Sequence, residues 1–341
     1  MVPVNTHAVP DPGSWFRVEN SSAASSVRRA AERLGGQLGL HPDRVAELAI
    51  VAAEMTSNLV KHAEEGLLLL RPVRDGDHAG VELVAIDSGP GMTDLTVSSR
   101  DGHSTTGTLG IGLGAISRQA SWYDAWSWPG KGTVLAVQVW PKAAPVRPAW
   151  AAGLTRPISG EQVSGDGHAV RVAEGRHQVL VCDGLGHGAL AGAAADTALA
   201  AFRTAPAAPP ATVVQHLHRA MTHTRGAALA VAELDPSAGV LRYAGLGNIT
   251  GVVLGAADER RGLVSLPGIA GHQRPSVREY DYAFPPEATL VMHSDGVVDR
   301  WRIGDYPGLT GRSPLVLAAT LLRDAGVRRD DACVLAARTP A

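Results

Sequence analysis

The chain has 341 residues, of which 45% are apolar and 19% charged, and its formal net charge is −2. This length suffices for two domains with separate cores, and the composition excludes an intrinsically disordered chain and a surface built to bind nucleic acid. No apolar run approaches the roughly 18 residues of a membrane-spanning helix, and the N-terminus lacks the apolar core of a signal peptide. The two cysteines lie in apolar runs, so we expect buried thiols in the reducing cytoplasm.

The sequence of the first 140 residues predicts a mixture of strands and helices. Residues 15–19 predict an edge strand, and a helix capped by Ser21 or Ser22 is expected to reach about residue 38. A second helix follows over residues 44–63, where apolar side chains recur at helical spacing. Further along we expect paired strands at 66–73 and 81–86, a helix over 111–119, and strands at 122–128 and 133–140.

Three motifs in this part carry chemistry. The second helix places Glu54, Asn58 and Lys61 on one face, because they stand at positions i, i+4 and i+7. Such a stripe on its own is typical of a solvated surface. Two glycine-rich segments favour a functional interpretation: residues 87–91 (DSGPG) end a strand, and residues 107–114 (GTLGIGLG) open a helix. Helix N-termini bind anions, and glycines allow a phosphate chain to approach the backbone closely.

In this order, the three motifs resemble the histidine-kinase-type ATPase fold, and within it the small anti-sigma-factor and RsbT-like serine/threonine kinases. The resemblance covers residues 1–140 and implies an α/β sandwich that binds ATP and Mg²⁺. It implies that Glu54 activates the group attacking the γ-phosphate, that Asn58 holds Mg²⁺, and that Lys61 contacts phosphate. Asp87 would bind the adenine amino group. The other implied nucleotide-binding positions are Gly89, Gly91, Gly107, Gly110, Gly112, Gly114 and Thr133, the last beside Gly132.

Residues 93–106 are polar and predict a short lid, in which His103 is either catalytic or solvated. This half has no helix pair with a phosphoacceptor histidine, which argues against a sensor histidine kinase. Residues 141–157 contain four prolines and are expected to form a linker. The alanine- and proline-rich residues 205–210 predict a surface loop without an assignable role.

The second half places an aspartate at one end of four separate β-like runs. Asp166 precedes the run 169–172, Asp183 ends 179–182, Asp295 ends 289–294, and Asp331 precedes 332–337. One such residue is ordinary turn chemistry. Four are better explained by convergence on hard cations, because Mg²⁺ and Mn²⁺ prefer carboxylate and carbonyl oxygens.

This pattern resembles the PPM-type metal-dependent protein phosphatases, specifically the SpoIIE and RsbX-like branch, over about residues 153–338. The resemblance implies an αββα sandwich with two Mn²⁺ or Mg²⁺ ions, whose bridging water attacks the phosphoryl group. The implied metal ligands are Asp166, Asp183, the Gly184 carbonyl, Asp295 and Asp331. Asn248 lies in a glycine-asparagine turn of the family. His187 is either an acid toward the leaving group or a helix cap, and no second acidic residue beside Asp166 supports a third metal.

We therefore predict a two-domain protein of the α/β (α+β) class, with an ATPase domain at 1–140, a linker at 141–157 and a phosphatase domain at 158–341. The expected function is a bifunctional switch that phosphorylates and dephosphorylates a STAS-domain partner, and so acts indirectly on a sigma factor, without nucleic acid or membrane. Two alternatives stay open: a non-catalytic ATP-binding adaptor domain, and a live kinase joined to a dead phosphatase. Oligomeric state stays open too. Candidate phosphopeptide-binding residues are Arg171, Arg176, Arg300 and Arg302.

Overall fold

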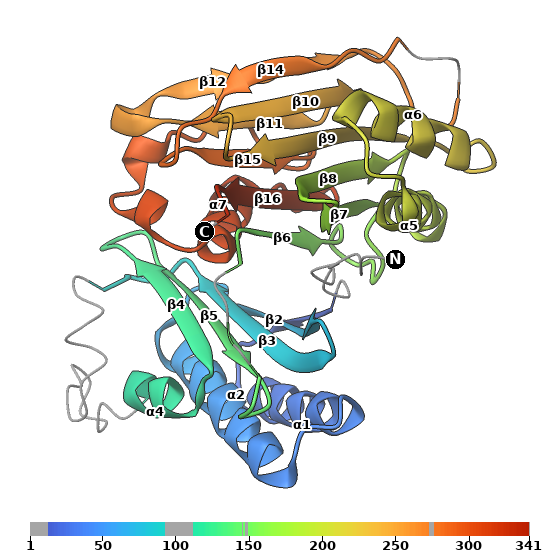
Figure 1. The fold of residues 1–341 in the computed structure, drawn as a ribbon. Coiled ribbons are helices and arrows are strands. Elements are labelled where there is room, and N and C mark those ends of the chain that lie inside the picture. Colours follow the sequence, from blue (N-terminus) through green and yellow to red (C-terminus); the bar gives the residue numbers. More distant parts are fainter. Residues whose placement is uncertain (1–12, 93–111, 145, 147–148, 273–275, 341) are drawn as a thin grey trace. The chain divides into compact units, whose positions relative to one another are not determined.

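The computed structural model describes residues 13–92, 112–144, 146, 149–272 and 276–340 (Figure 1). It divides into two compact units. The first unit comprises residues 10–148 together with residues 306–323, and the second contains residues 149–305 and 324–341. Residues 306–323 thus pack with the first unit, although sequence analysis places them in the second domain.

The first unit is an α/β sandwich, as predicted. Its antiparallel sheet has the order β1-β2-β3-β5-β4, and helices α1, α2 and α4 lie on one face of it (Figure 1). Leu48, Val51 and Met55 of α2 pack there against Leu83 and Val137 of the sheet. The bounds are β1 (Ser14–Arg17), α1 (Ser21–Gln37), α2 (Pro42–His62), β2 (Leu67–Asp75), β3 (His78–Asp87), α4 (Gly112–Gln119), β4 (Trp122–Ser127) and β5 (Thr133–Val139).

Two helix starts differ from the sequence-based expectation. The N-cap of α1 is Asn20, one residue before the predicted serines, and its Oδ1 accepts a hydrogen bond from the backbone N–H of Ala23 at 3.0 Å. Helix α2 begins at Pro42 rather than at residue 44. Proline is favoured at the first helical position because its missing N–H has no partner there in any case.

Residues 306–323 complete the first unit through contacts to β4. The indole Nε1 of Trp126 donates to the carbonyl of Pro307 at 3.0 Å, and the Trp126 and Tyr306 rings lie 5.7 Å apart. The backbone N–H of Ser313 donates to the carboxylate of Asp124 at 2.7 Å. This segment leads into helix α7 (Pro314–Ala325), whose residues 314–322 are all buried. A helix that is apolar all round needs partners on every side.

The second unit contains two sheets packed face to face, whose strands pair antiparallel except for β10 with β13, which pair parallel. One has the order β13-β10-β9-β8-β7 with β14 beside β10, the other β12-β11-β15-β16-β6. Val181, Ala230 and Tyr243 of the first sheet meet Leu290 and Leu335 of the second in a shared core. Helices α5 and α6 pack on the other face of the first sheet. The bounds are β7 (Asp166–Ala173), β8 (Arg176–Gly184), α5 (Ala189–Thr204), α6 (Pro210–Ala220), β9 (Ala227–Asp235), β10 (Val240–Leu246), β11 (Thr250–Leu254), β12 (Arg260–Gly262), β13 (Ser265–Leu266), β14 (Tyr280–Ala283), β15 (Thr289–His293) and β16 (Ala332–Arg338).

Part of the expected linker is a strand. Residues Ala151–Arg156 form β6, which pairs antiparallel with β16, with Ala151 opposite Ala337 and Arg156 opposite Ala332. The alanine-rich sequence has low strand propensity. The strand is instead held by backbone hydrogen bonds to β16. The predicted linker over 141–157 is therefore wrong for these six residues.

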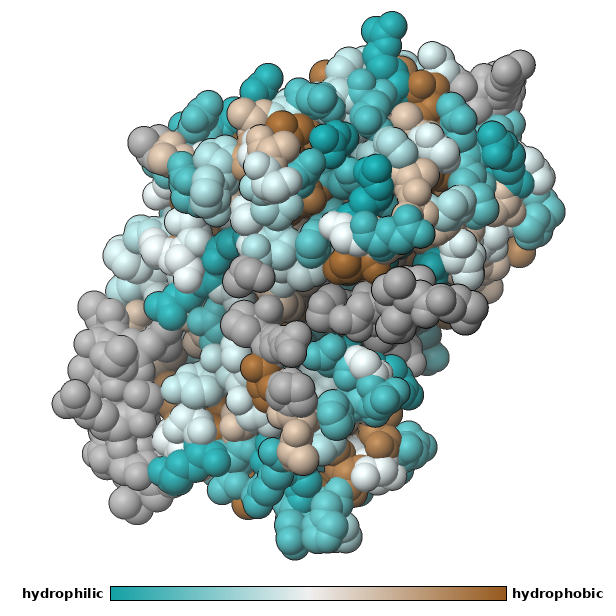
Figure 2. All heavy atoms as spheres, viewed as in Figure 1, coloured by the Kyte–Doolittle hydropathy of each residue, from teal (hydrophilic) through white to brown (hydrophobic). Residues whose placement is uncertain are grey.

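Apolar and hydrophilic residues are interspersed over the face drawn in Figure 2. Within the described ranges, no helix has both the length and the apolar character needed to cross a bilayer.

Candidate functional site

Helix α2 presents a row of polar side chains away from the core. Its buried residues, among them Leu48, Met55 and Leu59, face the sheet. Glu54 and Asn58 stand half-buried on another side of the helix, and Lys61 is exposed. Within the described part of the chain, these three side chains make no hydrogen bond or ion pair with another residue. Within these residues no competing contact occupies the row, and its role in binding a nucleotide stays a prediction.

Asp87 lies at the end of β3, as predicted. Its Oδ1 accepts a hydrogen bond from the backbone N–H of Gly89 at 2.8 Å, which closes the turn. Thr133 is its register partner on β5. Burial raises the pKa of the Asp87 carboxyl. Arg323, at the end of the segment that completes this unit, donates to the Asp87 backbone carbonyl at 3.0 Å.

Glycines allow the strand ends around Asp87 to approach one another. Gly132 has φ +68°, and a Cβ there would stand 2.0 Å from the Asp87 carbonyl oxygen. A Cβ on Gly91, at φ +69°, would stand equally close to the Trp128 carbonyl oxygen, and one on Gly89 would lie 2.5 Å from that of His62. The last contact brings the Asp87 turn against the C-terminal end of α2, next to Lys61. The structure thus gathers Lys61, Asp87, Gly89, Gly91 and Thr133 in one region.

Other predicted nucleotide-binding positions are only partly covered. Gly112 and Gly114 lie in the first turn of α4, so the glycine-rich segment does open a helix, as predicted. Gly107, Gly110 and His103 lie outside the described residues.

The four aspartates of the second unit converge. Asp166 on β7 and Asp183 on β8 are register partners. Asp183 interacts through its side chain with Asp295 and electrostatically with Asp330 and Asp331. Burial and the repulsion of neighbouring carboxylates raise the pKa of Asp183 to about 7, and they also raise that of Asp166 well above its ordinary value. A cluster of carboxylates with raised pKa values is one that lacks compensating positive charge.

Hydrogen bonds orient these carboxylates. Ser294 Oγ donates to Asp166 Oδ2 at 2.5 Å and accepts from the N–H of Cys333. Asn248 Nδ2 donates to Asp295 Oδ2 at 2.6 Å. The two oxygens of Asp331 accept from the N–H groups of residues 158 and 165, each at 2.7 Å. The sequence alone does not identify Ser294 as a site residue and assigns Asn248 no role. Both contacts depend on strand register, which no local sequence pattern reveals.

Glycines also set the spacing of this cluster. A Cβ on Gly184 would stand 2.4 Å from the Ala191 carbonyl oxygen, so helix α5 can begin close to the end of β8 only if residue 184 is glycine. A Cβ on Gly296 would stand 1.8 Å from the Asp331 carbonyl oxygen. The backbones that carry Asp183, Asp295 and Asp331 are thus packed at distances that exclude any side chain next to them.

The donor chemistry of this cluster fits Mg²⁺ or Mn²⁺, which prefer several carboxylate and carbonyl oxygens. Within the described residues, however, no group of three or more His, Cys, Asp or Glu side chains is already arranged to hold a metal ion. The mutual electrostatic effects show that the carboxylates are neighbours, while their hydrogen bonds hold the oxygens toward protein donors. The carboxylates are therefore close together, but their oxygens are not arranged as a preformed metal-binding site.

His187 lies beside this cluster. Its side chain is 64% exposed, and its Nδ1 stands 3.7 Å from a Glu161 carboxylate oxygen. The N-cap of α5 is Gly188, without a side-chain capping bond. The prediction that His187 caps the helix is therefore wrong, and its role as an acid stays a prediction.

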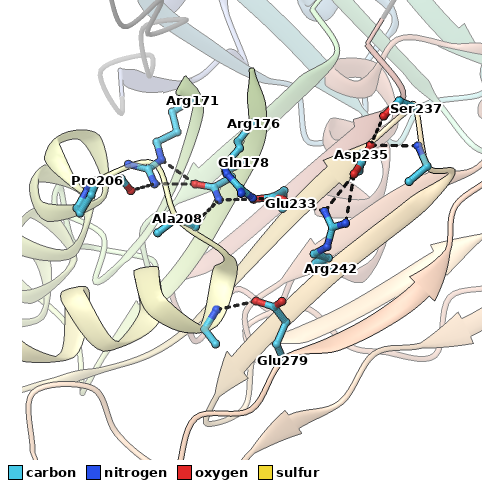
Figure 3. A network of polar contacts seen from close by, with 12 residues as sticks. Arg171, Arg176, Gln178, Pro206, Ala208, Glu233, Asp235, Ser237, Arg242 and Glu279 are labelled. Atoms are coloured by element: carbon cyan, nitrogen blue, oxygen red, sulfur yellow. Dashed lines mark hydrogen bonds and ion pairs between the residues drawn. The ribbon is translucent and has the colours of Figure 1, made fainter. Parts of the chain in front are cut away.

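Two of the four arginines proposed for phosphopeptide binding are occupied elsewhere (Figure 3). Arg171 is fully buried and donates to the carbonyls of Phe202, Ala205 and Pro206 at 2.7 to 3.2 Å. Arg176 pairs with the buried carboxylate of Glu233. The network thus satisfies the carbonyls at the C-terminal end of α5, which gives the loop over 205–210 a structural role.

Comparison with protein families assigns both halves. Residues 9–138 match the family model of the histidine kinase-like ATPase domain, and residues 173–340 match that of stage II sporulation protein E (SpoIIE). This chain fuses a histidine kinase-like ATPase domain to a SpoIIE-type PPM phosphatase domain. The two resemblances stated from the sequence are confirmed, and so is the predicted fold class.

The ATPase domain is similar to the serine/threonine-protein kinase RsbT of Bacillus subtilis (strain 168), with 28% identity over 127 residues, which are 37% of this chain and 96% of that protein. A solved structure described as "The bacterial stressosome: a modular system that has been adapted to control secondary messenger signaling" shares 29% identity, with a TM-score of 0.49, over 55% of this chain and 98% of that one. RsbX in complex with magnesium shares 16% identity, with a TM-score of 0.47, over 55% and 94% of the two chains.

Proposed function

We propose that the chain is a bifunctional switch protein: an ATP-dependent serine/threonine kinase joined to a metal-dependent phosphoserine/phosphothreonine phosphatase. The observation that supports the phosphatase best is the convergence of Asp166, Asp183, Asp295 and Asp331 from four strand ends. The kinase is supported by the open polar row on α2 next to the Asp87 turn, and by the similarity to a serine/threonine kinase over nearly all of that protein's length.

In the phosphatase site, Asp166, Asp183, Asp295, Asp331 and the Gly184 carbonyl would hold two Mn²⁺ or Mg²⁺ ions. Such ions acidify a bound water and neutralise the phosphoryl oxygens. The chain's own contribution is orientation: Ser294 fixes Asp166 and Asn248 fixes Asp295. Hydrogen-bonding partners of this kind tune the ligands they orient.

In the ATPase domain, Asp87 would accept a hydrogen bond from the adenine amino group, while Asn58 would hold Mg²⁺ and Lys61 would contact phosphate. Glu54 would act as the base toward the hydroxyl of the target. Its carboxylate makes no bond to a described residue, so it is free to accept a proton from an incoming serine or threonine. The proposed target is a STAS-domain partner, through which the chain would control a sigma factor indirectly.

A second candidate function is a phosphatase whose ATPase domain binds ATP as a non-catalytic adaptor. The decisive experiment incubates the full chain and Glu54→Ala with STAS proteins of the same genome and labelled ATP. The bifunctional proposal expects the wild type to label a serine or threonine and the variant to bind ATP without labelling. Binding of ATP and of the partner, without labelling by the wild type, would establish the adaptor.

The phosphatase is tested separately with the phosphorylated partner and Mn²⁺. We expect release of phosphate by the wild type and by Glu54→Ala, and loss of release in Asp183→Ala. A wild type that labels the partner but never releases phosphate would establish the third alternative, a live kinase with a dead phosphatase.

A further inference from the structure

Arg225 stands on a short segment that precedes β9 and lies against the loop following Asp183. The backbone N–H of Leu185 donates to the carbonyl of Gly226 at 3.0 Å. In the strand ladder, Asp183 is opposite Ala228 and Gly184 is opposite Ala227. The start of β9 is therefore tied, residue by residue, to the strand end that carries the central aspartate of the phosphatase site.

The backbone around Arg225 is held on both sides. The N–H of Gly226 donates to Thr224 Oγ1 at 3.0 Å, and that hydroxyl donates to the Met221 carbonyl at 2.8 Å. Gly226 has φ +81°, and a Cβ there would stand 2.6 Å from the Ala270 carbonyl oxygen. Residue 226 must therefore be glycine, and the segment has little freedom to carry Arg225 away from its position.

The Arg225 side chain lies against the loop that follows Asp183. Its Nη1 lies 3.4 Å from the point where a Cβ on Gly186 would stand. The Gly186 carbonyl oxygen in turn lies 3.2 Å from the corresponding point on Gly165, whose N–H donates to Asp331. Arg225 thus contacts the loop residue Gly186, whose carbonyl in turn lies close to Gly165.

The guanidinium of Arg225 is exposed and, within the described ranges, has no hydrogen bond or ion pair. Three other arginines of this unit are occupied: Arg171 by carbonyls, and Arg176 and Arg242 by Glu233. A cation that lies against the loop after Asp183, and that pairs with no carboxylate of the described residues, is available for an anion at that loop.

We propose that Arg225 binds the non-bridging oxygens of the substrate's phosphoryl group and so sets the affinity of the phosphatase for phosphoserine and phosphothreonine. The proposal rests on the phosphatase function proposed above. A phosphate monoester is doubly charged, and the carboxylate-rich site repels it except where cations compensate. A guanidinium offers two parallel N–H donors that match two phosphoryl oxygens, which an ammonium cannot reproduce.

The test uses the full chain with Mn²⁺ and a phosphoserine peptide, in wild type, Arg225→Ala and Arg225→Lys. The matched control is Arg203→Ala. Arg203 is also exposed, but it lies near the opposite end of α5 from the site, roughly 20 Å along the helix. We expect Arg225→Ala to raise KM about tenfold or more and to change kcat far less, because a charge-assisted bond to the bound phosphate is lost. Arg225→Lys should recover part of the loss, and Arg203→Ala should match the wild type.

A second readout is independent of turnover. Inorganic phosphate is titrated calorimetrically into the Mn²⁺-loaded chain, and Mn²⁺ into the metal-free chain. We expect Arg225→Ala to weaken phosphate binding about as much as it raises KM, with unchanged Mn²⁺ affinity. Unchanged KM and phosphate affinity in Arg225→Ala would overturn this proposal alone, and so would a loss of Mn²⁺ affinity that accounts for the whole effect. A wild type that hydrolyses no phosphopeptide would overturn the phosphatase function and this proposal with it.

Discussion

The two candidate sites are built in opposite ways. The polar row on α2 comes from one helix, and its members have no partners among the described residues. The aspartate cluster comes from four strand ends, and the charges of neighbouring carboxylates act on Asp166 and Asp183. The first site can receive a ligand without giving up internal bonds. The second stores electrostatic repulsion that only bound cations or protons relieve, so its ligands should also change the stability of the fold.

The comparison is tested most severely by a pair of substitutions, one in each site. We expect Glu54→Ala to reduce phosphorylation of the partner by about 10²- to 10⁴-fold, the usual contribution of a general base, with phosphatase activity intact. Asp183→Ala should abolish Mn²⁺-dependent phosphate release and leave ATP affinity unchanged. Steady-state rates and nucleotide titrations measure both. A variant that damages both activities would show that the sites are not separate.

The residues that orient the aspartates should matter next most. Asn248→Ala removes the amide that donates to Asp295, and we expect a loss of roughly 10- to 100-fold in Mn²⁺ affinity or in phosphatase rate. Asn248→Asp is the informative companion, because it keeps the size and replaces a donor by another charge. An equal rate in Asn248→Ala and wild type would show that Asp295 does not need this contact.

The buried network around Arg171 contrasts with the aspartate cluster, because its buried charge is satisfied by hydrogen-bond acceptors. Arg171→Leu leaves the Phe202 and Ala205 carbonyls and the Gln178 side chain without a donor. Since each unsatisfied buried group costs about 1–3 kcal/mol, we expect a loss of about 3 kcal/mol in the free energy of unfolding, measured by urea denaturation. Arg176→Leu should cost less, because Arg176 is itself partly exposed and Glu233 keeps its bonds to Arg242 and Gln178. An unchanged free energy of unfolding in Arg171→Leu would show that water satisfies these carbonyls instead.

The smallest expected effect concerns pH. The raised pKa values of Asp166 and Asp183 mean that, between the ordinary value of 3.8 and about 7, the folded chain holds protons that the unfolded chain has released. The contribution of these groups to stability is therefore present at low pH and is lost as pH rises through that window. Cations replace the protons, so the rise in Tm caused by Mn²⁺ should be larger near pH 8 than near pH 5. Thermal scans in chelator and in Mn²⁺ measure it, and equal shifts would contradict the repulsion described here.

The sequence predicts most of what depends on local pattern. Strands β2 and β3, helices α1 and α2, and the aspartates at strand ends follow from periodicity and from turn residues. The row on α2 is predictable because three residues of one helix share a face whatever the fold. The resemblance to known families then assigns these residues their candidate roles.

What the sequence does not predict depends on contacts between distant residues. Ser294 contacts Asp166 and Cys333, which lie 128 and 39 residues away from it along the chain. The sequence of β6 indicates a linker because alanine and glycine have low strand propensity, and only the pairing with β16 makes it a strand. Likewise, the largely apolar residues 314–322 indicate a buried helix but not the sheet against which it packs.

The return of residues 306–323 to the first unit has a consequence for synthesis. A ribosome finishes the sheet of that unit at residue 139, yet Trp126, which is 2% exposed in the finished protein, lacks Tyr306 and the Pro307 carbonyl until more than half of the remaining polypeptide has emerged. Domains generally fold as they are synthesised, but the first unit cannot complete its fold until residues 306–323 have been made. We therefore expect an ATPase domain truncated after residue 148 to expose Trp126 to solvent and to aggregate.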